Sequence, residues 1–390
     1  MTVPHPELGA AWRAARPHLR VTHLDAAGCS VHSAATLAAV SAHLEREASI
    51  GGYPAAADVV PVLDRAREHL GALVGLSHDE VGFVANATDG FAALFAAWPL
   101  PSGARVACST AEYASNAMLV SAAGARGRVT PVLLAVDDAG VVDLDALDRQ
   151  LDEGLDLLLL CPVASHRGVV QPTAEVVRRC HDAGTAVILD VAQAVGQVDV
   201  SDTGADAFVA PSRKWLCGPR GVGFVAVRRS WGERLDVAPS MATHAWDGDL
   251  AVAPAPFPTG PRISIDETSF GVLMGWANAL EELHAAGPAL LRERIAALGR
   301  AARESLDGVA GWQVQEAHDS PSGSVVLDHD SLDTTRVHAA LRAVGVVTSL
   351  LHMPRAPADL PRPKLRLSFH AYADDSDIAV ATEMLARVSQ

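Results

Sequence analysis

A lysine and an aspartate stand at the ends of two apolar segments in the middle of this 390-residue chain. Asp190 ends "AVILD", and Lys214 follows "AFVAPSR" before the glycine- and proline-rich turn "CGPRG". Alone, Asp190 is a good helix N-cap, and a lysine among buried strands is costly unless its amine has a use. Together they are the pair that pyridoxal phosphate needs. The lysine forms an imine with its aldehyde, and the carboxylate keeps its ring nitrogen protonated.

Further polar residues follow neighbouring apolar segments. "VANATDG" runs from a predicted strand into a helix whose first amides, at Ala87 and Thr88, suit a phosphate together with the Thr88 hydroxyl. Tyr113 follows the next strand and is placed to stack on a pyridine ring, although a tyrosine there is more often a packing residue. Ser165 and His166 follow a fourth strand. Each residue is ambiguous alone, but ligands of open α/β sheets bind at the carboxyl ends of the strands.

The elements that must position these residues are alternating strands and helices. Strands are predicted at "VGFVAN", "RVACS", "VTPVLLAV", "LDLLLLCP", "AVILDV", "AFVAPS" and "GVGFVAV". Between them, apolar spacing predicts helices at 59–75, 113–124, 144–152 and 173–183. This alternation predicts an α/β fold with a mostly parallel, seven-stranded sheet covered on both faces.

The pattern changes from about residue 270. Two long helices, at 270–286 and 288–306, lead into four short strands and helices near 333–343 and 375–388, which predicts a small α+β domain. We therefore expect an N-terminal arm (1–20), a large cofactor-binding α/β domain (21–265) and a small C-terminal domain (266–390). The N-terminal segment is expected to contribute to the small domain or to the substrate side. The irregular segments 253–261 and 353–363 are predicted to be active-site or interface loops.

Composition narrows the class of protein. The chain has 31 basic and 46 acidic residues and a net charge of −15, which argues against nucleic-acid or acidic-membrane partners. No run of 18 apolar residues and no signal-peptide core is found, so no membrane association is expected. Five scattered cysteines without a CxxC pair favour a reducing cytoplasm. The 16 histidines show no metal-ligand spacing, so no metal site is predicted.

The blocks "ILDVAQAVGQVDV" and "ADAFVAPSRKWLCGPRGVGFVAV", in that order, closely resemble the cofactor segment of the class V aminotransferase family, whose members are fold-type I pyridoxal-phosphate enzymes. The resemblance extends through "HLDAAGCS", "NATDG", "AEYASN", "ASHRGVVQP" and "KLRLSFHAYADDSDI", nearly the whole chain. It implies a fold-type I transferase fold, pyridoxal 5'-phosphate as cofactor, a small amino-acid substrate and a homodimer.

The resemblance also implies roles for single residues. Lys214 attaches the cofactor covalently, and Asp190 pairs with its ring nitrogen; these two are the predicted catalytic residues. The other implied cofactor contacts are Ala87 and Thr88 to the phosphate, Tyr113 to the ring, Gln193 to the phenolic oxygen, further contacts from Ser165, Ser212 and Arg213, and Thr268 or Ser269 from the partner subunit. The implied substrate-side residues are Gly28, His32, His166 and Arg366, of which Arg366 clamps the α-carboxylate. The chain departs from most relatives by having Arg213 where they have histidine, and Pro211 where desulfurases often have serine.

Several reactions remain open at the level of residues. The loop before Arg366 has no cysteine, which argues against cysteine desulfuration through a persulfide. Lys214 is the natural base, and β-elimination, transamination and epimerisation all stay possible. "ASHRGVVQP" with "PSRKWLCGPRGVG" is similar to the branch that contains the hercynylcysteine sulfoxide lyases of ergothioneine biosynthesis and the lincosamide-pathway enzymes acting on cysteine conjugates, a sister of which decarboxylates and oxidatively deaminates instead. This likeness favours a carbon–sulfur β-lyase of natural-product biosynthesis acting on an S-substituted cysteine, as thioether or sulfoxide.

The sulfur substituent needs polar contacts from the rim of the site. Candidates in rim loops are His32, Tyr53, His166, Asp266, Glu267, His352 and Arg355, although each alone is more often a solvated loop residue. A rival class is a non-catalytic binding protein with a decayed site. The joint presence of Asp190, Gln193, Lys214 and Arg366 argues against this rival.

Overall fold

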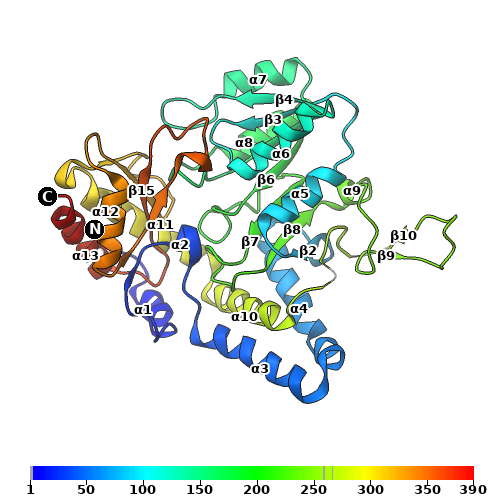
Figure 1. Cartoon of the computed structure of the whole chain (residues 1–390), viewed down its shortest axis with the longest axis horizontal. Coiled ribbons are helices and arrows are strands. Elements are labelled where there is room, and N and C mark those ends of the chain that lie inside the picture. The colour runs from blue at the N-terminus through cyan, green and yellow to red at the C-terminus, as the bar shows by residue number, and fades with distance from the viewer. Residues whose placement is uncertain (1–2, 258–259, 266) are drawn as a thin grey trace.

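The computed structural model describes residues 3–257, 260–265 and 267–390, so the rim candidate Asp266 lies outside the described residues. Its centre is a seven-stranded sheet (Figure 1). In spatial order the strands are β2 (Val81–Val84), β8 (Gly223–Val227), β7 (Ala207–Pro211), β6 (Ala186–Asp190), β5 (Leu157–Leu160), β3 (Ala104–Ser109) and β4 (Val129–Leu134). Strand β8 is antiparallel to both neighbours, and the remaining pairs are parallel. The predicted seven-stranded, mostly parallel sheet is therefore confirmed.

Helices cover both faces of this sheet. Alternate residues of β5 pack on opposite sides: Leu157 and Leu159 join one apolar cluster, and Leu158 and Leu160 join another. Because both faces are buried at β5, β6, β7 and β8, these strands are continuous apolar runs without polar alternation, whereas the edge strand β4 is half exposed. The first cluster includes residues from α5 (Ala87–Ala97) and α6 (Ala114–Ala125), and the second includes residues from α4 (Gly52–Val74), α7 (Leu144–Asp152), α8 (Thr173–Asp182) and α10 (Phe270–Ala286).

A smaller antiparallel sheet forms a second unit, on the left of Figure 1. Its strands in order are β11 (Gln313–Val314), β12 (Ser324–Asp328), β15 (Lys364–Ser368) and β14 (Ser349–Leu351). Its core is a separate apolar cluster that contains Leu298, Trp312 and Leu367. The helices that contribute to this cluster are α11 (Pro288–Leu306), α12 (Thr334–Ala343) and α13 (Asp375–Val388).

The N-terminal segment is attached to this smaller unit. Strand β1 (Thr22–His23) pairs in parallel with β13 (Val346–Val347). In α1 (Pro6–Ala14), the guanidinium of Arg13 lies 2.9 Å from the carboxylate of Asp377. The short helix α2 (Ala26–Cys29) and the long α3 (Ala34–Ile50) follow, and α3 packs against α10. The predicted domain boundaries stay predictions.

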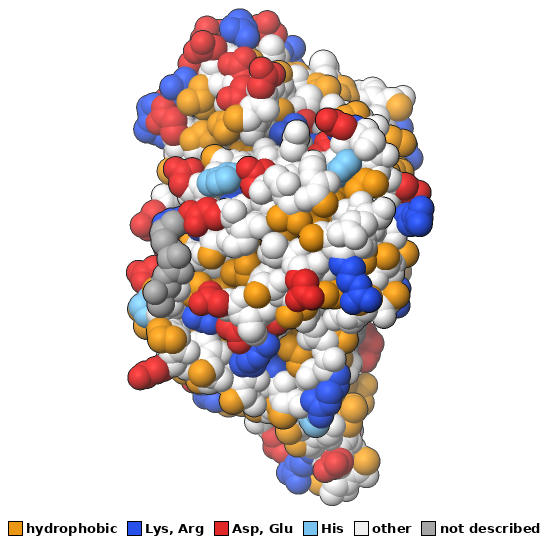
Figure 2. Space-filling view, turned by 90° about the vertical axis from the view of Figure 1, so that its left-hand side faces the viewer, with side chains coloured by type: hydrophobic (Ala, Val, Ile, Leu, Met, Phe, Trp, Pro, Cys, Tyr) orange, Lys and Arg blue, Asp and Glu red, His pale blue; other side chains and the backbone are white. Residues whose placement is uncertain are grey.

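The remaining elements are short. They are α9 (Arg229–Gly232), β9 (His244–Ala245), β10 (Ala255–Pro256), η1 (His78–Glu80), η2 (Val309–Gly311) and η3 (Met353–Arg355). The β9–β10 pair projects from the body at the right of Figure 1. The opposite side of the molecule carries acidic and basic side chains interspersed with apolar ones (Figure 2). No helix among the described residues is both long and apolar enough to cross a membrane, and the five cysteines, all within the described ranges, are free.

Candidate active site

A pocket lies at the carboxyl edge of the large sheet and gathers most of the predicted cofactor contacts. Strands β2, β3, β5, β6 and β7 all end at this edge, because β8 alone runs against them. The pocket is lined by Asn86, Ala87, Thr88, Tyr113, Asn116, Cys161, Val163, Ser165, Asp190, Ala192, Gln193, Pro211, Arg213 and Lys214. Residues far apart in the chain thus meet where ligands of open α/β sheets bind.

Lys214 brings an amine without a partner into this pocket. Its ammonium makes no hydrogen bond or ion pair with any described residue. Burial lowers the pKa of Lys214 to about 7, because removal from water disfavours the charged form more than nearby Asp190 favours it. The neighbouring Arg213, Arg366 and Arg355 lower this pKa further. A partly neutral, unpartnered amine is the form that reacts with an aldehyde.

Asp190 is held by hydrogen bonds to both carboxylate oxygens. Its Oδ1 accepts from the backbone amide of Ala192 at 3.0 Å, and its Oδ2 accepts from Nδ2 of Asn116 at 2.8 Å. The side chain is buried at the end of β6. A buried, oriented carboxylate facing the same pocket as an unpartnered amine fits a pyridine ring nitrogen on one side and an aldehyde carbon on the other.

The start of α5 provides the anion-binding end of the pocket. Asn86 caps the helix by accepting from the amide of Asp89 at 2.9 Å. The amides of the first helical residues, Ala87 and Thr88, have no intrahelical acceptor and lie at the positive end of the helix dipole. Arg213 also lines the pocket, and its guanidinium donates to the carbonyl of Gly28 in α2. This end of the pocket is suited to a phosphate.

Tyr113 and Gln193 complete the pocket walls. Tyr113 lines the pocket immediately before α6, where it precedes the first helical turn. The Gln193 side chain is fixed on both sides, because its Nε2 donates to the carbonyl of Ala27 at 2.9 Å and its Oε1 accepts from Nε1 of Trp215 at 3.1 Å. Their roles toward a ring and its phenolic oxygen stay predictions.

Six predicted site residues do not line this pocket. Ser212 is fully buried and its hydroxyl donates to the carbonyl of Pro219, which stabilises the turn after β7. Thr268 lies just before α10. The imidazole of His32 lies 3.2 Å from the carbonyl oxygen of Cys217. The substrate-side residues lie outside this pocket, in or near α2, β5 and β15; they are Gly28, His32, His166 and Arg366. The roles of these four residues and of Ser212 and Thr268 stay predictions.

Arg366 is buried where the small sheet meets the pocket wall. Its Nη1 donates to the carbonyl of Ser165 at 2.6 Å, and its Nη2 donates to Oγ of Ser349 at 2.9 Å. Asp25 forms an ion pair with it at 3.4 Å, and its buried Nε has no partner. Burial lowers the pKa of Arg366 to about 10, so it stays charged at neutral pH with one donor unused.

The irregular segment 353–363 is fastened to the loop after β5. Asp359 accepts from Nε2 of His166 at 2.6 Å and from Nε and Nη2 of Arg167 at 2.5 and 2.6 Å. The Asp359 side chain is 9% exposed and that of His166 is 2% exposed, so the group is largely removed from water. His166 therefore ties a loop from the smaller unit to the loop after β5 that also contains Ser165.

Sequence reasoning missed three residues around Asp190: Glu112, Asn116 and the pocket role of Cys161. The atoms of Glu112, Cys161 and Asp190 that could bind a metal ion lie within 4.8 Å of one another. The Cys161 thiol donates to Oε1 of Glu112 at 3.0 Å, and burial together with Glu112 holds its pKa well above the ordinary value. A protonated thiol favours a hydrogen-bonded group over a metal site. Glu112 precedes α6 and Asn116 lies in its first turn, so no local periodicity indicated that both would meet Asp190.

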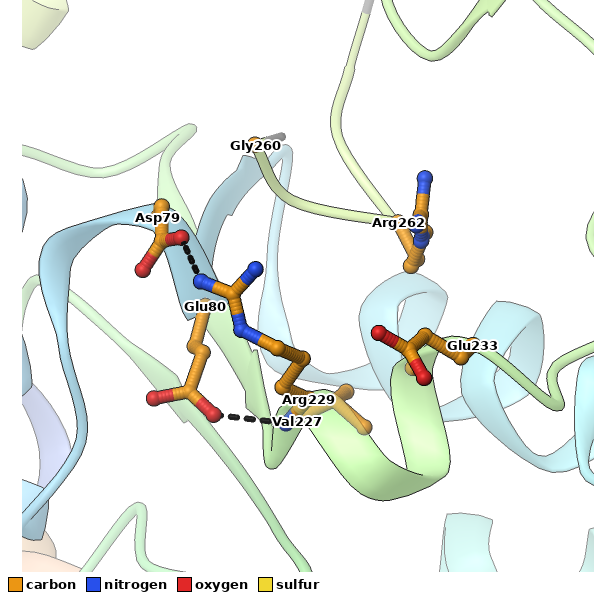
Figure 3. A pocket seen from close by; sticks show the side chains of 8 residues that line it. Asp79, Glu80, Val227, Arg229, Glu233, Gly260 and Arg262 are labelled. Carbon is orange, nitrogen blue, oxygen red and sulfur yellow. Dashed lines mark hydrogen bonds and ion pairs between the residues drawn. The ribbon is translucent and has the colours of Figure 1, made fainter. Parts of the chain in front are cut away.

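A second hollow lies at the opposite edge of the large sheet, where β2 begins. There Asp79 pairs with Arg229, and Glu80 accepts from the backbone amide of Arg229 at 2.6 Å (Figure 3). Glu233 and Arg262 face the same space (Figure 3). The main charges here pair with each other, and the hollow lies away from the strand ends where ligands bind.

Comparison with known proteins agrees with this geometry. A family model described as aminotransferase class-V matches residues 22–380. The chain is 39% identical over 374 residues, 95% of this chain and 91% of the relative, to a probable hercynylcysteine sulfoxide lyase of Mycobacterium tuberculosis. Two solved structures share the fold. One is an apo cysteine desulfurase from Thermococcus onnurineus, with a TM-score of 0.86 and 17% sequence identity over 99% of this chain and 98% of that one. The other is a mutant of C-DES with glycine covalently linked to its PLP cofactor, with a TM-score of 0.85 and 18% sequence identity over 96% of this chain and 98% of that one.

Proposed function

The chain belongs to the class V aminotransferase family and uses pyridoxal phosphate, and on this premise we propose that it is a carbon–sulfur β-lyase acting on an S-substituted cysteine. The conjugate R–S–CH₂–CH(NH₂)–COOH, with water, gives R–SH, pyruvate and ammonia; a sulfoxide gives the sulfenic acid R–SOH instead. The observation that carries the proposal is that Lys214 and the buried Asp190 share one pocket, while Cys161, the one cysteine among the described residues that line this pocket, is held protonated.

The residues divide the work between cofactor and substrate. Bound pyridoxal phosphate supplies the electron sink for negative charge at the substrate Cα. Asp190 holds a proton at the ring nitrogen, and the α5 terminus with Thr88 and Arg213 holds the phosphate. Lys214 would hold the aldehyde, and its free amine would carry a proton from the substrate Cα to the departing sulfur. Its lowered pKa places about half of the free amine in the neutral form near pH 7, against roughly three to four parts in ten thousand for an ordinary lysine.

Arg366 is proposed to bind the substrate α-carboxylate. Its unused Nε and its position beside Ser165 support this role. Arg355 lies close enough to lower the pKa values of both Lys214 and Arg366, so it is a candidate contact for the sulfur substituent. We propose the same side for His32, His166 and Gly28.

The cysteines favour a lyase over a desulfurase. The segment between Thr348 and Arg366 contains no cysteine. Cys161 lines the pocket, but burial keeps its thiol protonated, and a protonated thiol is a poor nucleophile. The lack of a reactive cysteine is consistent with a substrate like the hercynylcysteine sulfoxide in the name of the mycobacterial relative.

A homodimer is part of this proposal. Tyr53, 95% exposed, and Leu44, 48% exposed, lie on α4 and α3. A Cβ added at Gly271, near the start of α10, would lie 3.2 Å from Leu44, so Thr268 is close to this apolar surface. A second copy on this surface would cover it and bring Thr268 toward its partner's phosphate site. Light scattering should find the parent protein to be a dimer and the Leu44→Asp variant to be a monomer. A monomeric parent protein would overturn the proposed homodimer.

The first experiment measures pyruvate release by the holoenzyme from S-conjugated cysteines, offered as thioethers and sulfoxides with hercynyl, sugar and simple alkyl substituents. One pyruvate per conjugate consumed is expected. Consumption with carbon dioxide or a keto acid in place of pyruvate would indicate the decarboxylating or transaminating alternative, and loss of optical activity would indicate epimerisation. A protein that takes up no cofactor would indicate the non-catalytic alternative.

The lysine assignment has an unusually clean control, because the sequence has only two lysines, Lys214 and Lys364. Borohydride reduction of the holoprotein should attach the cofactor to the peptide that contains Lys214. Lys364→Arg should keep both attachment and activity, and Lys214→Ala should lose both. Label on Lys364 would contradict the assignment.

A further inference from the structure

Glu112 lies behind Asp190, is 2% exposed and does not line the pocket itself. Among the described residues, the groups that act on its charge include no cation. Its nearest titratable neighbours are Asp190 and Cys161, whose ligand atoms lie within 4.8 Å of its own. Two carboxyl groups and no adjacent cation are thus buried together, which is unfavourable if both are ionised.

The hydrogen bonds of Glu112 are distributed unevenly between its two oxygens. Oε1 accepts from the amide of Tyr113, from Nδ2 of Asn116 and from the thiol of Cys161, each at 3.0 Å. Oε2 is buried and has no partner. An ionised carboxyl carries charge on both oxygens and needs donors at both, whereas the O–H of a neutral acid is itself a donor, and leaving it unpaired costs less than leaving a charged oxygen unpaired. The pattern is that of a neutral acid with its proton on Oε2.

Asn116 connects Glu112 to Asp190. Its Nδ2 lies 3.0 Å from Oε1 of Glu112 and 2.8 Å from Oδ2 of Asp190, so its two hydrogens serve one carboxyl group each. With the Ala192 amide on Oδ1, this fixes the plane of the Asp190 carboxylate. Removal of Glu112 would leave the Asn116 amide held from one side only.

We propose that Glu112 is a positioning residue, a neutral carboxylic acid that fixes the Asp190 carboxylate through Asn116 without adding a second negative charge beside the cofactor. This inference rests on the proposed role of Asp190 at the ring nitrogen. The groups facing Glu112 are Asp190 from β6, Cys161 after β5 and Cys108 from β3. Burial, and then Asp190, raise the pKa of Glu112 to about 7, so the acid form dominates on the acid side of neutrality.

The first test is infrared spectroscopy of the apoprotein, in which the carbonyl stretch of a protonated carboxylic acid is resolved from that of carboxylates. The difference between parent and Glu112→Gln is expected to contain this band below neutral pH and to lose it as pH rises through about 7. Absence of the band at mildly acidic pH would overturn the proposal. Because no cofactor is present, the result does not depend on the proposed function.

The second test measures coupling to Asp190. Asp190→Asn should lower the apparent pKa of Glu112 by about 1 to 2 pH units, since a charge about 5 Å away is removed from a site of intermediate dielectric. Glu316 is a matched internal control, because burial also raises its pKa to about 7 but it lies beside Arg303 in the smaller unit. The Glu316 titration, identified with Glu316→Gln, should not move. An unmoved Glu112 titration would contradict the coupling.

The third test separates positioning from charge. Glu112→Gln keeps an acceptor and a neutral side chain, so its cofactor affinity should stay within about 3-fold of the parent. Glu112→Ala should lose about 10-fold or more, the value of one hydrogen bond to a charged group, and the ¹⁵N shift of labelled cofactor should show a less protonated ring nitrogen. Equal losses in both variants would show that the ionised carboxylate is needed and would overturn the proposal. Failure of the parent itself to bind cofactor would instead refute the proposed function.

Discussion

The Asp359 cluster allows a prediction with a worked magnitude. Asp359→Asn keeps the shape of the side chain but leaves the Arg167 guanidinium without its counter-charge. Removing one partner of a fully buried ion pair lowers the free energy of unfolding by about 3–5 kcal/mol, and removing one partner of a surface ion pair lowers it by about 0–1 kcal/mol. The Asp359 and Arg167 side chains are 9% and 18% exposed, nearer the buried case, so we expect a loss of about 2–3 kcal/mol in the free energy of unfolding. Urea denaturation measures this loss.

The pH dependence of this loss is also fixed by the cluster. Burial raises the pKa of Asp359, but the hydrogen bonds from Arg167 and His166 outweigh it and hold this pKa below its usual range. A carboxyl with a lowered folded pKa stabilises fully above its unfolded pKa, about 3.9, and loses this contribution only below it. The Asp359 carboxyl by itself should therefore keep the gap between parent and variant constant from pH 8 to about pH 7. Below about pH 6.5 the gap should widen, because Asp359 raises the pKa of His166 and its loss makes the buried imidazole harder to protonate in the folded state than in the unfolded chain.

A matched control is available on the surface. Asp330 pairs with Arg362 at 3.0 Å with its side chain 83% exposed, so Asp330→Asn should change stability by less than about 0.5 kcal/mol. In a double-mutant cycle, Arg167→Met should recover part of the cost of Asp359→Asn, because the uncompensated cation is gone. A loss from Asp359→Asn no larger than that from Asp330→Asn would refute the reasoning.

Three further predictions concern the pocket and the core. Lys214→Met should stabilise the apoprotein by about 1–3 kcal/mol near pH 7, a figure discounted for water in the pocket, because the unfolded chain binds a proton that the folded site disfavours. Above about pH 10 the lysine is neutral in both states, and the stabilisation should be small. Thermal unfolding at several pH values measures this difference. Arg366→Lys should raise KM for the cysteine conjugate about 10- to 100-fold with a smaller change in kcat, since an ammonium cannot bind a carboxylate bidentately; steady-state kinetics that show an unchanged KM would contradict the clamp. Leu189→Ala, at a fully buried strand position, should cost about 2–5 kcal/mol in urea unfolding while leaving the visible spectrum of the bound cofactor unchanged.

The helices expected at 144–152, 270–286, 288–306 and 375–388 match α7, α10, α11 and α13 in the structure. These segments have strong local signals, such as the Asp143 and Ser269 caps. In contrast, α3 was not predicted, because its exposed and buried positions give only a weak apolar face over 17 residues. The two-residue strands β1 and β13 are also beyond local reasoning, since each is stabilised by a partner more than 300 residues away.

What the sequence determined by itself is the fold class and the chemical set at the strand ends. Continuous apolar strands between amphipathic helices specify a doubly covered parallel sheet, and the carboxyl ends of such strands share an edge by geometry alone. The order of Asp190, Gln193 and Lys214 along the chain therefore sufficed to predict a common pocket.

Only the tertiary structure decided which side chains are used by the protein's own packing and which stay free. Ser212 is committed to the turn and His166 to Asp359, whereas Lys214 finds no partner in the described part of the chain. Glu112 and Asn116 meet Asp190 across 74 residues or more of chain, and no local pattern carries that contact. Hydrogen-bond partners and desolvation depend on the packed neighbours of each group, and these exist only once the chain has folded.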